Sequence, residues 1–334
     1  MTDVTLVSEQ PFGEGGLVSR LYQLKNGLKV LLLRDPSAPV FAYQTWFSVG
    51  SRHEREGKTG IAHLFEHLMF NETQNLPHGE FDRRFELAGG NTNAATWVDW
   101  TYYQDDLPAS ELALAVSLES ERMQNLLLRE RQVETERGVV ISERQMRVDD
   151  DVDGFMSEEL FRLAFTTHPY HWPTIGWMQD IRNLSLDDCE RFYRTYYAPN
   201  NATVVVVGDI DEQNTLALIE KYYGHIAAQQ IPPHAPIVEP VQTGERRATY
   251  KKPVMTDKLQ TATPDKTLGH ALHLMLPIKA LKINGFIGRR GNREPGQDGR
   301  DEGASRQHGQ HGKARAAGRF VDGLFEFPAR IGGV

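Results

Sequence analysis

The sequence contains one cysteine, no long hydrophobic run and no excess of basic residues. Because Cys189 has no second cysteine to pair with, a disulfide within the chain is excluded, which is typical of a reducing compartment. No apolar run approaches the roughly 18–20 residues that span a bilayer, so no membrane segment is predicted. Residues 1–20 lack the basic stretch and apolar core of a secretory signal. These absences favour a soluble, cytoplasmic protein.

Acidic residues outnumber basic ones, and the excess is uneven along the chain. The 37 Lys and Arg and the 45 Asp and Glu give a net charge of −8. Residues 285–334 carry nine basic and six acidic side chains, so the first 284 residues have a balance of −11. An acidic surface repels nucleic-acid phosphates and anionic membranes. Neither nucleic acid nor a membrane is therefore expected as a partner.

Strand and helix signals alternate irregularly from an N-terminal hairpin onward. Asn26-Gly27 between two apolar stretches is typical of a tight hairpin turn, and Thr59 is placed to cap a helix that begins at Ile61. Strands are predicted over residues 22–25, 28–34, 40–49, 93–104 and 202–208, and helices over residues 61–70, 80–88, 109–128, 129–148, 185–197 and 211–223. This order favours an α+β fold in which an antiparallel sheet is packed with helices.

Length and composition predict more than one domain. A chain of 334 residues has room for two domains, and the four prolines between residues 231 and 240 are typical of a linker. We expect a first domain over residues 18–245 and an incomplete second domain over residues 246–284. Residues 285–334 hold 12 of the 29 glycines, and residues 288–318 contain no Val, Ile, Leu, Met or aromatic side chain. A tail with so little to bury is predicted to be disordered.

The pentapeptide His63-Leu64-Phe65-Glu66-His67 lies in a predicted helix. Residues at i and i+4 share a helical face with Cβ atoms about 6 Å apart, so both imidazoles can reach one metal ion at about 2.0–2.1 Å. Glu66 falls on the same side without having to bind the ion. The order H-x-x-E-H is a known zinc-peptidase motif. The same five residues also fit a plain surface helix with two histidines.

A catalytic zinc site needs a third protein ligand and an open position for water. Glu143 lies on the helix predicted over residues 129–148, and Glu136 lies two turns earlier on the same face. Taken alone, a glutamate on so charged a helix is more often solvated than bound to metal. Residue spacing therefore leaves the third ligand open.

Several segments around the motif carry a family resemblance. They are Val49-Gly50-Ser51-Arg52, the run from Gly60 to Phe70, the run from Gly89 to Thr96 with Asp99 and Tyr102, Arg122-Met123, Glu136 with residues 139–143, His168-Pro169-Tyr170, and the run from Tyr197 to Asn201 with Val207-Gly208-Asp209. Over residues 18–265 the chain resembles the pitrilysin/insulinase (inverzincin) zinc metallopeptidases. It is most similar to the half-length members related to the mitochondrial processing peptidase.

The resemblance implies a role for each residue of the motif. His63, His67 and Glu143 would bind one Zn²⁺, and Glu66 would be the catalytic base. Glu136 would be a carboxylate beside the metal ligands that does not itself bind the ion. Two neutral imidazoles and one carboxylate leave the ion with net positive charge, which lowers the pKa of its water towards ~7 and polarises the scissile carbonyl. The base takes the proton from that water and returns it to the leaving amine.

The resemblance also implies how a peptide substrate is held. The run Asn93-Ala94-Ala95-Thr96 matches an edge strand to which an extended peptide adds as a further strand through backbone hydrogen bonds, with Asn93, Ala94 and Ala95 expected to bind the substrate. Without the resemblance, Asn93 would be interpreted as a turn residue.

Other conspicuous side chains are expected to be structural. Three further histidines lack helical spacing to the motif and are not expected to bind metal: His53, His168 and His171. Four aromatic residues that follow the predicted edge strand are expected to pack in the core: Trp97, Trp100, Tyr102 and Tyr103.

The chain departs from the family pattern in its second half. A half-length member carries two similar α+β domains, and the second contributes an Arg-Tyr pair near the substrate carbonyl. Here no Arg-Tyr dipeptide follows residue 240, and strand and helix signals end near residue 285. We therefore expect a C-terminal half that is truncated or frameshifted, and a homo- or hetero-oligomeric partner that supplies the missing half.

The sequence thus predicts a zinc-dependent endopeptidase that hydrolyses peptides or unfolded protein segments, with a chain that is weak or inactive alone. The alternative is a non-catalytic partner subunit of a two-chain peptidase or a substrate-holding module. Metal content discriminates between them, because a non-catalytic partner has no need to hold zinc.

Overall fold

The computed structural model describes residues 3–13, 15–233, 237–252 and 258–261. The chain divides into two compact units, Met1–Gln260 and Thr261–Val334. The helices and strands below all belong to the first unit. The predicted tail over residues 285–334, and most of the predicted segment 246–284, lie outside the described residues.

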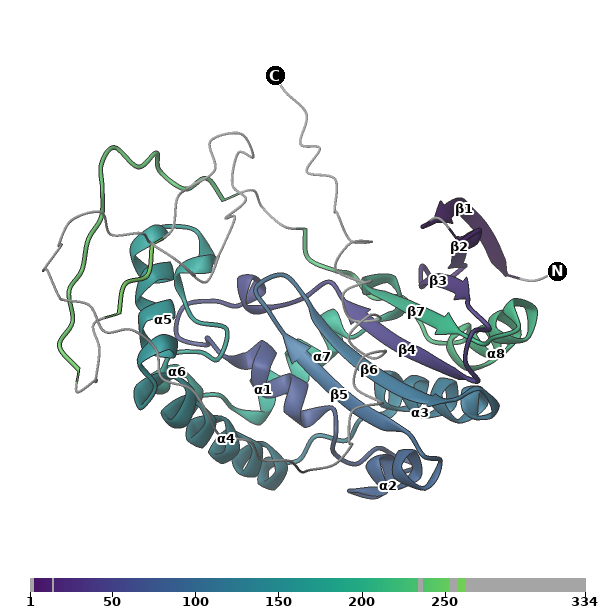
Figure 1. Ribbon diagram of the computed structural model, residues 1–334. Helices are drawn as coiled ribbons and strands as arrows, with labels where there is room; N and C mark the ends of the chain where they lie inside the picture. Colours follow the sequence, from purple (N-terminus) through teal and green to yellow (C-terminus); the bar gives the residue numbers. More distant parts are fainter. Residues whose placement is uncertain (1–2, 14, 234–236, 253–257, 262–334) are drawn as a thin grey trace, which may run out of the picture. The chain divides into compact units, whose positions relative to one another are not determined.

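The described residues form a sheet with helices around it (Figure 1). The strands are β1 (Val4–Phe12), β2 (Leu17–Leu24), β3 (Lys29–Arg34), β4 (Val40–Phe47), β5 (Asn91–Thr96), β6 (Thr101–Pro108) and β7 (Ala202–Gly208). The α-helices are α1 (Ile61–Leu68), α2 (Glu80–Leu87), α3 (Leu112–Asn125), α4 (Glu130–Arg144), α5 (Val152–Ala164), α6 (Met178–Arg182), α7 (Leu186–Tyr196) and α8 (Glu212–Tyr223). The seven strands form a single sheet in the order β1-β2-β3-β7-β4-β6-β5. The predicted α+β class, with a mainly antiparallel sheet packed with helices, is confirmed.

Strand β7 completes the sheet from a distant part of the sequence. It pairs parallel with β3 and antiparallel with β4, so it lies between two N-terminal strands. The run Val204-Val205-Val206 is buried, which suits an apolar strand in the middle of a sheet. The predicted bounds of this strand are correct, but its parallel pairing with β3 is not foreseen by the sequence analysis.

The predicted hairpin at the start of the sheet is confirmed. β2 and β3 pair antiparallel, and Asn26 Oδ1 accepts a hydrogen bond of 3.2 Å from the Leu28 N–H inside the turn. Gly27 has a φ of 91°, in the left-handed region that glycine adopts at little cost. The turn residues favour this hairpin locally, and Asn26 Nδ2 also attaches it to the distant Tyr223 O and Ile226 O.

The strand predicted over residues 93–104 is in fact two strands, so this prediction is wrong. β5 and β6 pair antiparallel, and a hydrogen bond of 2.8 Å from Trp97 N to Trp100 O closes the turn between them. The turn contains neither glycine nor proline, the usual signals. It is held from outside: Trp97 O accepts from the Ser51 N–H at 3.1 Å, and a Cβ on Gly50 would lie 2.2 Å from Trp97 O. The result is that β5 lies at the edge of the sheet.

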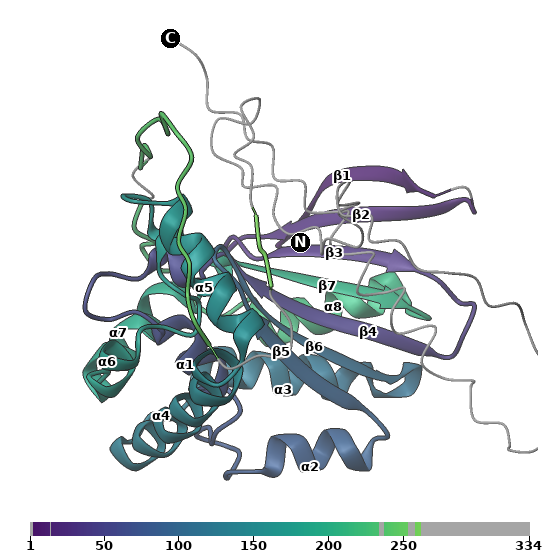
Figure 2. The same cartoon turned by 60° about the vertical axis from the view of Figure 1, so that its left-hand side comes forward.

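Helices α1, α3, α7 and α8 pack on one face of the sheet around a common core (Figure 2). Tyr103 is fully buried in this core, as predicted. The prediction is wrong for Trp97, which is 42% exposed, and for Trp100 and Tyr102, which are half-buried beside Trp46. Successive side chains of a strand point to opposite faces, so Tyr102 and Tyr103 cannot both face the core.

Helix α1 begins differently from the prediction that Thr59 caps it. The N-cap is Gly60, with a left-handed φ of 90°, and a Cβ on this residue would lie 2.6 Å from Ile175 O. The carboxylate of Glu54 accepts hydrogen bonds of 2.9 Å from both the Gly60 and the Ala62 N–H groups. Thr59 Oγ1 donates instead to Asp180 at 2.7 Å. A carboxylate from outside the helix thus replaces the local cap.

β1, α5 and α6 were not predicted. β1 and α5 contain no fully buried residue, and α6 has only five residues. None of the described helices is both long and apolar enough to cross a membrane.

Candidate metal centre

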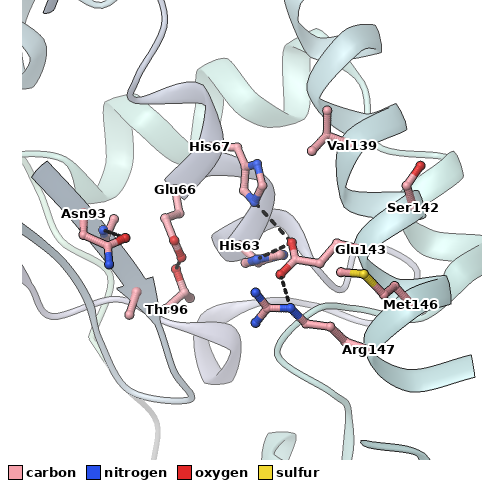
Figure 3. Close-up of a pocket in the computed structure, with 12 residues that line it drawn as sticks. His63, Glu66, His67, Asn93, Thr96, Val139, Ser142, Glu143, Met146 and Arg147 are labelled. Carbon is pink, nitrogen blue, oxygen red and sulfur yellow. Dashed lines mark hydrogen bonds and ion pairs between the residues drawn. The ribbon is translucent and has the colours of Figure 1, made fainter. Parts of the chain in front are cut away.

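The three motif residues project from one side of α1. Leu64, Phe65 and Leu68 are fully buried in the core on the other side of this helix. Burial of that apolar side turns His63, Glu66 and His67 outward into a cavity (Figure 3). The two imidazole rings lie one turn apart, with centroids separated by 4.9 Å and planes at 82°. Local helical geometry alone therefore forms this half of the site.

Glu143 approaches the two histidines from α4. Its Oε2 atom lies 3.4 Å from His63 Nε2 and 3.5 Å from His67 Nε2 (Figure 3). Two donors bound at about 2.0–2.1 Å to a tetrahedral ion are about 3.3–3.4 Å apart, so these distances fit a shared zinc ion. One donor atom from each residue lies within 4.8 Å of the others. The residues present therefore fit a zinc ion.

The charge states of the two histidines differ. Burial and, secondarily, the neighbouring charge of His67 lower the pKa of His63 to about 4, so it is neutral and ready to bind metal. Burial also acts to lower the pKa of His67, but its hydrogen bonds with Glu136 and Glu143 outweigh this and raise the pKa to about 9. A metal ion must then displace a proton from His67.

Glu136 lies on the opposite side of the His67 ring from Glu143. Its Oε2 atom is 3.5 Å from His67 Nδ1, and its Oε1 atom accepts from Asn71 Nδ2 at 3.4 Å. The hydrogen bond with His67 lowers the pKa of Glu136, so the carboxylate stays charged. A carboxylate on the second ring nitrogen sets the tautomer and orientation of a ligand histidine.

Glu66 is in the same cavity but faces β5. Its Oε2 atom accepts a hydrogen bond of 2.5 Å from Thr96 Oγ1, at the end of that strand. Burial raises the pKa of Glu66, and the Thr96 hydrogen bond partly opposes this shift. Thr96 thus ties the carboxylate of Glu66 to the edge strand.

The cavity has a volume of about 640 Å³, and α1 forms its base. β5 lies on one side of this base, and α4 with the π-helical turn that extends it lies on the other. The lining residues are His63, Glu66, His67, Asn93, Ala94, Ala95, Thr96, Val139, Ser142, Glu143, Met146 and Arg147. The residues predicted to bind the metal, to act as the base and to hold the substrate therefore all line one cavity. Glu136 does not line this cavity but contacts His67.

Arg147, which lines the cavity, was not foreseen from the sequence, and Thr96 was expected only as part of the edge strand and not as the partner of Glu66. Arg147 Nε lies 3.0 Å from Glu143 Oε1. A signal for it exists, because Glu and Arg at i and i+4 on a helix commonly pair. No such local spacing predicts the hydrogen bond made by Thr96, whose partner is thirty residues earlier in the chain. Among the described residues, the histidines at 53, 168 and 171 belong to no such three-ligand cluster.

Comparison with known proteins points to one family. The family model described as insulinase (peptidase family M16) matches residues 29–176, and that described as peptidase M16 inactive domain matches residues 183–270. The chain is 39% identical over 232 residues to the zinc protease PqqE of Helicobacter pylori, covering 69% of this chain and 52% of the relative. It is 25% identical to the beta subunit of the mitochondrial-processing peptidase of Blastocladiella emersonii, covering 83% of this chain and 59% of the relative.

Solved structures agree with these relatives. The crystal structure of a protease from Helicobacter pylori matches with a TM-score of 0.65 and 36% identity, over 71% of this chain and 55% of that one. The chain therefore spans about half the length of the curated relatives it matches.

Proposed function

Because the chain belongs to the insulinase family, peptidase family M16, we propose that it is the metal-binding part of a zinc endopeptidase. The observation that carries this proposal is the approach of one Glu143 oxygen to Nε2 of both His63 and His67, at 3.4 and 3.5 Å, beside the carboxylate of Glu66. His63, His67 and Glu143 would hold one zinc ion per chain, and Glu136 would orient His67.

The bound ion would supply Lewis-acid chemistry, polarising the scissile carbonyl and lowering the pKa of a water molecule. Glu66 then acts as the general base that accepts a proton from that water and passes it to the leaving amine. Its position supports this role, since its Oε2 atom is held by Thr96 while the carboxylate remains in the cavity. A pKa raised by burial brings this carboxylate closer to the working pH that suits a general base.

We propose that the substrate is a peptide or an unfolded protein segment that adds to β5. This strand lies at the edge of the described sheet, and Asn93, Ala94 and Ala95 line the cavity. Backbone hydrogen bonds to an edge strand bind extended peptides of many sequences.

A partner, either a further protein segment or a second chain, would form the opposite wall of the cavity. This proposal rests on the length of the relatives, of which the chain spans about half. Correct positioning of reactants contributes ~7–11 kcal/mol to lowering a barrier, so a site without its opposite wall is expected to turn over slowly. We therefore expect the isolated chain to bind zinc and to cleave peptides slowly.

The test measures zinc content and peptide cleavage in parallel. His63→Ala, His67→Ala and Glu143→Ala should each lose zinc, whereas Glu66→Gln should keep zinc and lose any cleavage. Glu134→Gln, an exposed glutamate on α4, is the matched control and should resemble the wild type. Loss of zinc in Glu66→Gln equal to that in His63→Ala would contradict the assigned roles. A wild-type chain that holds no zinc would favour the non-catalytic partner subunit.

A further inference from the structure

The two oxygens of Glu143 have different partners. Oε2 faces the two histidines, at 3.4 and 3.5 Å from their Nε2 atoms. Oε1 faces away from them and lies 3.0 Å from Arg147 Nε (Figure 3). The terminal torsion of a glutamate side chain is broad, so an unrestrained carboxylate exchanges its two oxygens freely. Here the guanidinium opposes that rotation.

The backbone of Arg147 is held in place by the element that follows it. α4 ends at Arg144 and continues as a π-helical turn, Gln145–Asp149, which contains Arg147. A Cβ on Gly154 of α5 would lie 1.8 Å from Arg147 O, so α5 packs directly against this turn. The π-turn shifts the register after Glu143, and such turns are frequent at functional sites.

A buried ion pair secures the residue directly before this turn, Arg144, to α5. Arg144, whose side chain is 6% exposed, donates to both carboxylate oxygens of Glu158 at 2.7 and 3.0 Å and to Gly176 O at 2.8 Å. A bidentate pair of this kind has a defined geometry as well as strength. The Arg147 side chain therefore starts from a fixed backbone position although it is itself 69% exposed.

We propose that Arg147 is a positioning residue for Glu143, holding one oxygen so that the carboxylate presents the other to the metal ion. The inference rests on the proposed function, because it takes Glu143 to be a ligand. A partner that orients a metal ligand typically changes metal affinity 10- to 100-fold. The opposing effect, repulsion between the guanidinium and the ion, is weakened by water because the Arg147 side chain is largely exposed. We expect positioning to outweigh this repulsion, and the direction of the change in zinc affinity tests that expectation.

The experiment measures Zn²⁺ affinity by competition with a chelator, and the visible spectrum of the Co²⁺-substituted protein. Arg147→Ala should bind zinc about 10-fold more weakly, and its cobalt spectrum should change because the carboxylate can bind through both oxygens. Arg147→Lys keeps the charge without the planar Nε–H and should recover only part of the affinity. If Arg147→Ala does not fold, the zinc affinity and the cobalt spectrum of Arg147→Lys test the proposal instead.

Arg194→Ala is the matched control. Arg194 follows Glu190 by four residues on α7 and lies 3.1 Å from it, with a side chain that is 75% exposed, and neither residue lines the cavity. This variant should bind zinc like the wild type. Unchanged or tighter zinc binding by Arg147→Ala, or weaker binding with an unchanged cobalt spectrum, would overturn the inference and leave the proposed function intact. Failure of the wild type to bind zinc would overturn the proposed function and the inference with it.

Discussion

Zinc binding by this chain is expected to tighten about 50-fold between pH 7 and pH 9, because His67 must lose a proton before it can bind the ion. Burial would lower the pKa of His67, but its hydrogen bonds with Glu136 and Glu143 raise the pKa to about 9. A histidine binds metal only as the neutral imidazole. The protonated form is therefore a competitor of the metal.

The size of the effect follows from this pKa. With a pKa of about 9, about 1% of His67 is neutral at pH 7 and about half at pH 9. The affinity should then rise about 10-fold per pH unit from pH 6 to about pH 8.5 and level off above pH 9. His63 adds no slope in this range, because burial and the charge of His67 lower its pKa to about 4. The slope thus corresponds to one proton.

The assay is a chelator competition between pH 6 and pH 10, corrected for protonation of the chelator. Glu136→Gln removes a carboxylate that hydrogen-bonds to His67, so its affinity should level off at a lower pH than that of the wild type. Glu134→Gln, on the exposed side of α4, should follow the wild-type profile. Equal zinc affinity at pH 7 and pH 9, or superimposable profiles for Glu136→Gln and the wild type, would refute the reasoning.

Two further substitutions test other contacts around the site. Thr96→Val removes the 2.5 Å hydrogen bond to Glu66 and should reduce peptide cleavage about 10-fold without changing zinc content. Thr96→Ser keeps the hydroxyl and should recover the activity. An equal loss of cleavage in both variants would contradict this role of Thr96. Gly154→Ala places a Cβ 1.8 Å from Arg147 O and should destabilise the fold by about 1–3 kcal/mol in thermal unfolding. Gly138→Ala, whose new Cβ meets nothing within 4 Å beyond the backbone of its own helix and its chain neighbours, should be neutral or slightly stabilising.

The sequence alone determined the half of the site on α1. His63 and His67 are one helical turn apart, and the buried side of the helix carries Leu64, Phe65 and Leu68. Any packing that buries these apolar side chains turns both imidazoles away from the core, because side-chain direction repeats with the helical period. The hairpin turn is also predicted locally, since Asn-Gly favours a tight turn and Asn26 Oδ1 accepts from the Leu28 N–H. Distant contacts add to it, because Asn26 Nδ2 donates to Tyr223 O and Ile226 O.

The other half of the site was decided only by the tertiary structure. Spacing along α4 did not distinguish Glu143 from the other glutamates of that helix. Only the family resemblance identified it as the third metal ligand. Its direction is set by packing, since Val133 and Val140 are fully buried and α4 lies against α1. Contact between α1 and β5 places Thr96 beside Glu66. Gly50 and Ser51 hold the turn that follows β5 from outside, and β5 remains at the edge of the described sheet. Sequence patterns report the conformation of neighbouring residues, whereas these contacts depend on which distant elements pack together.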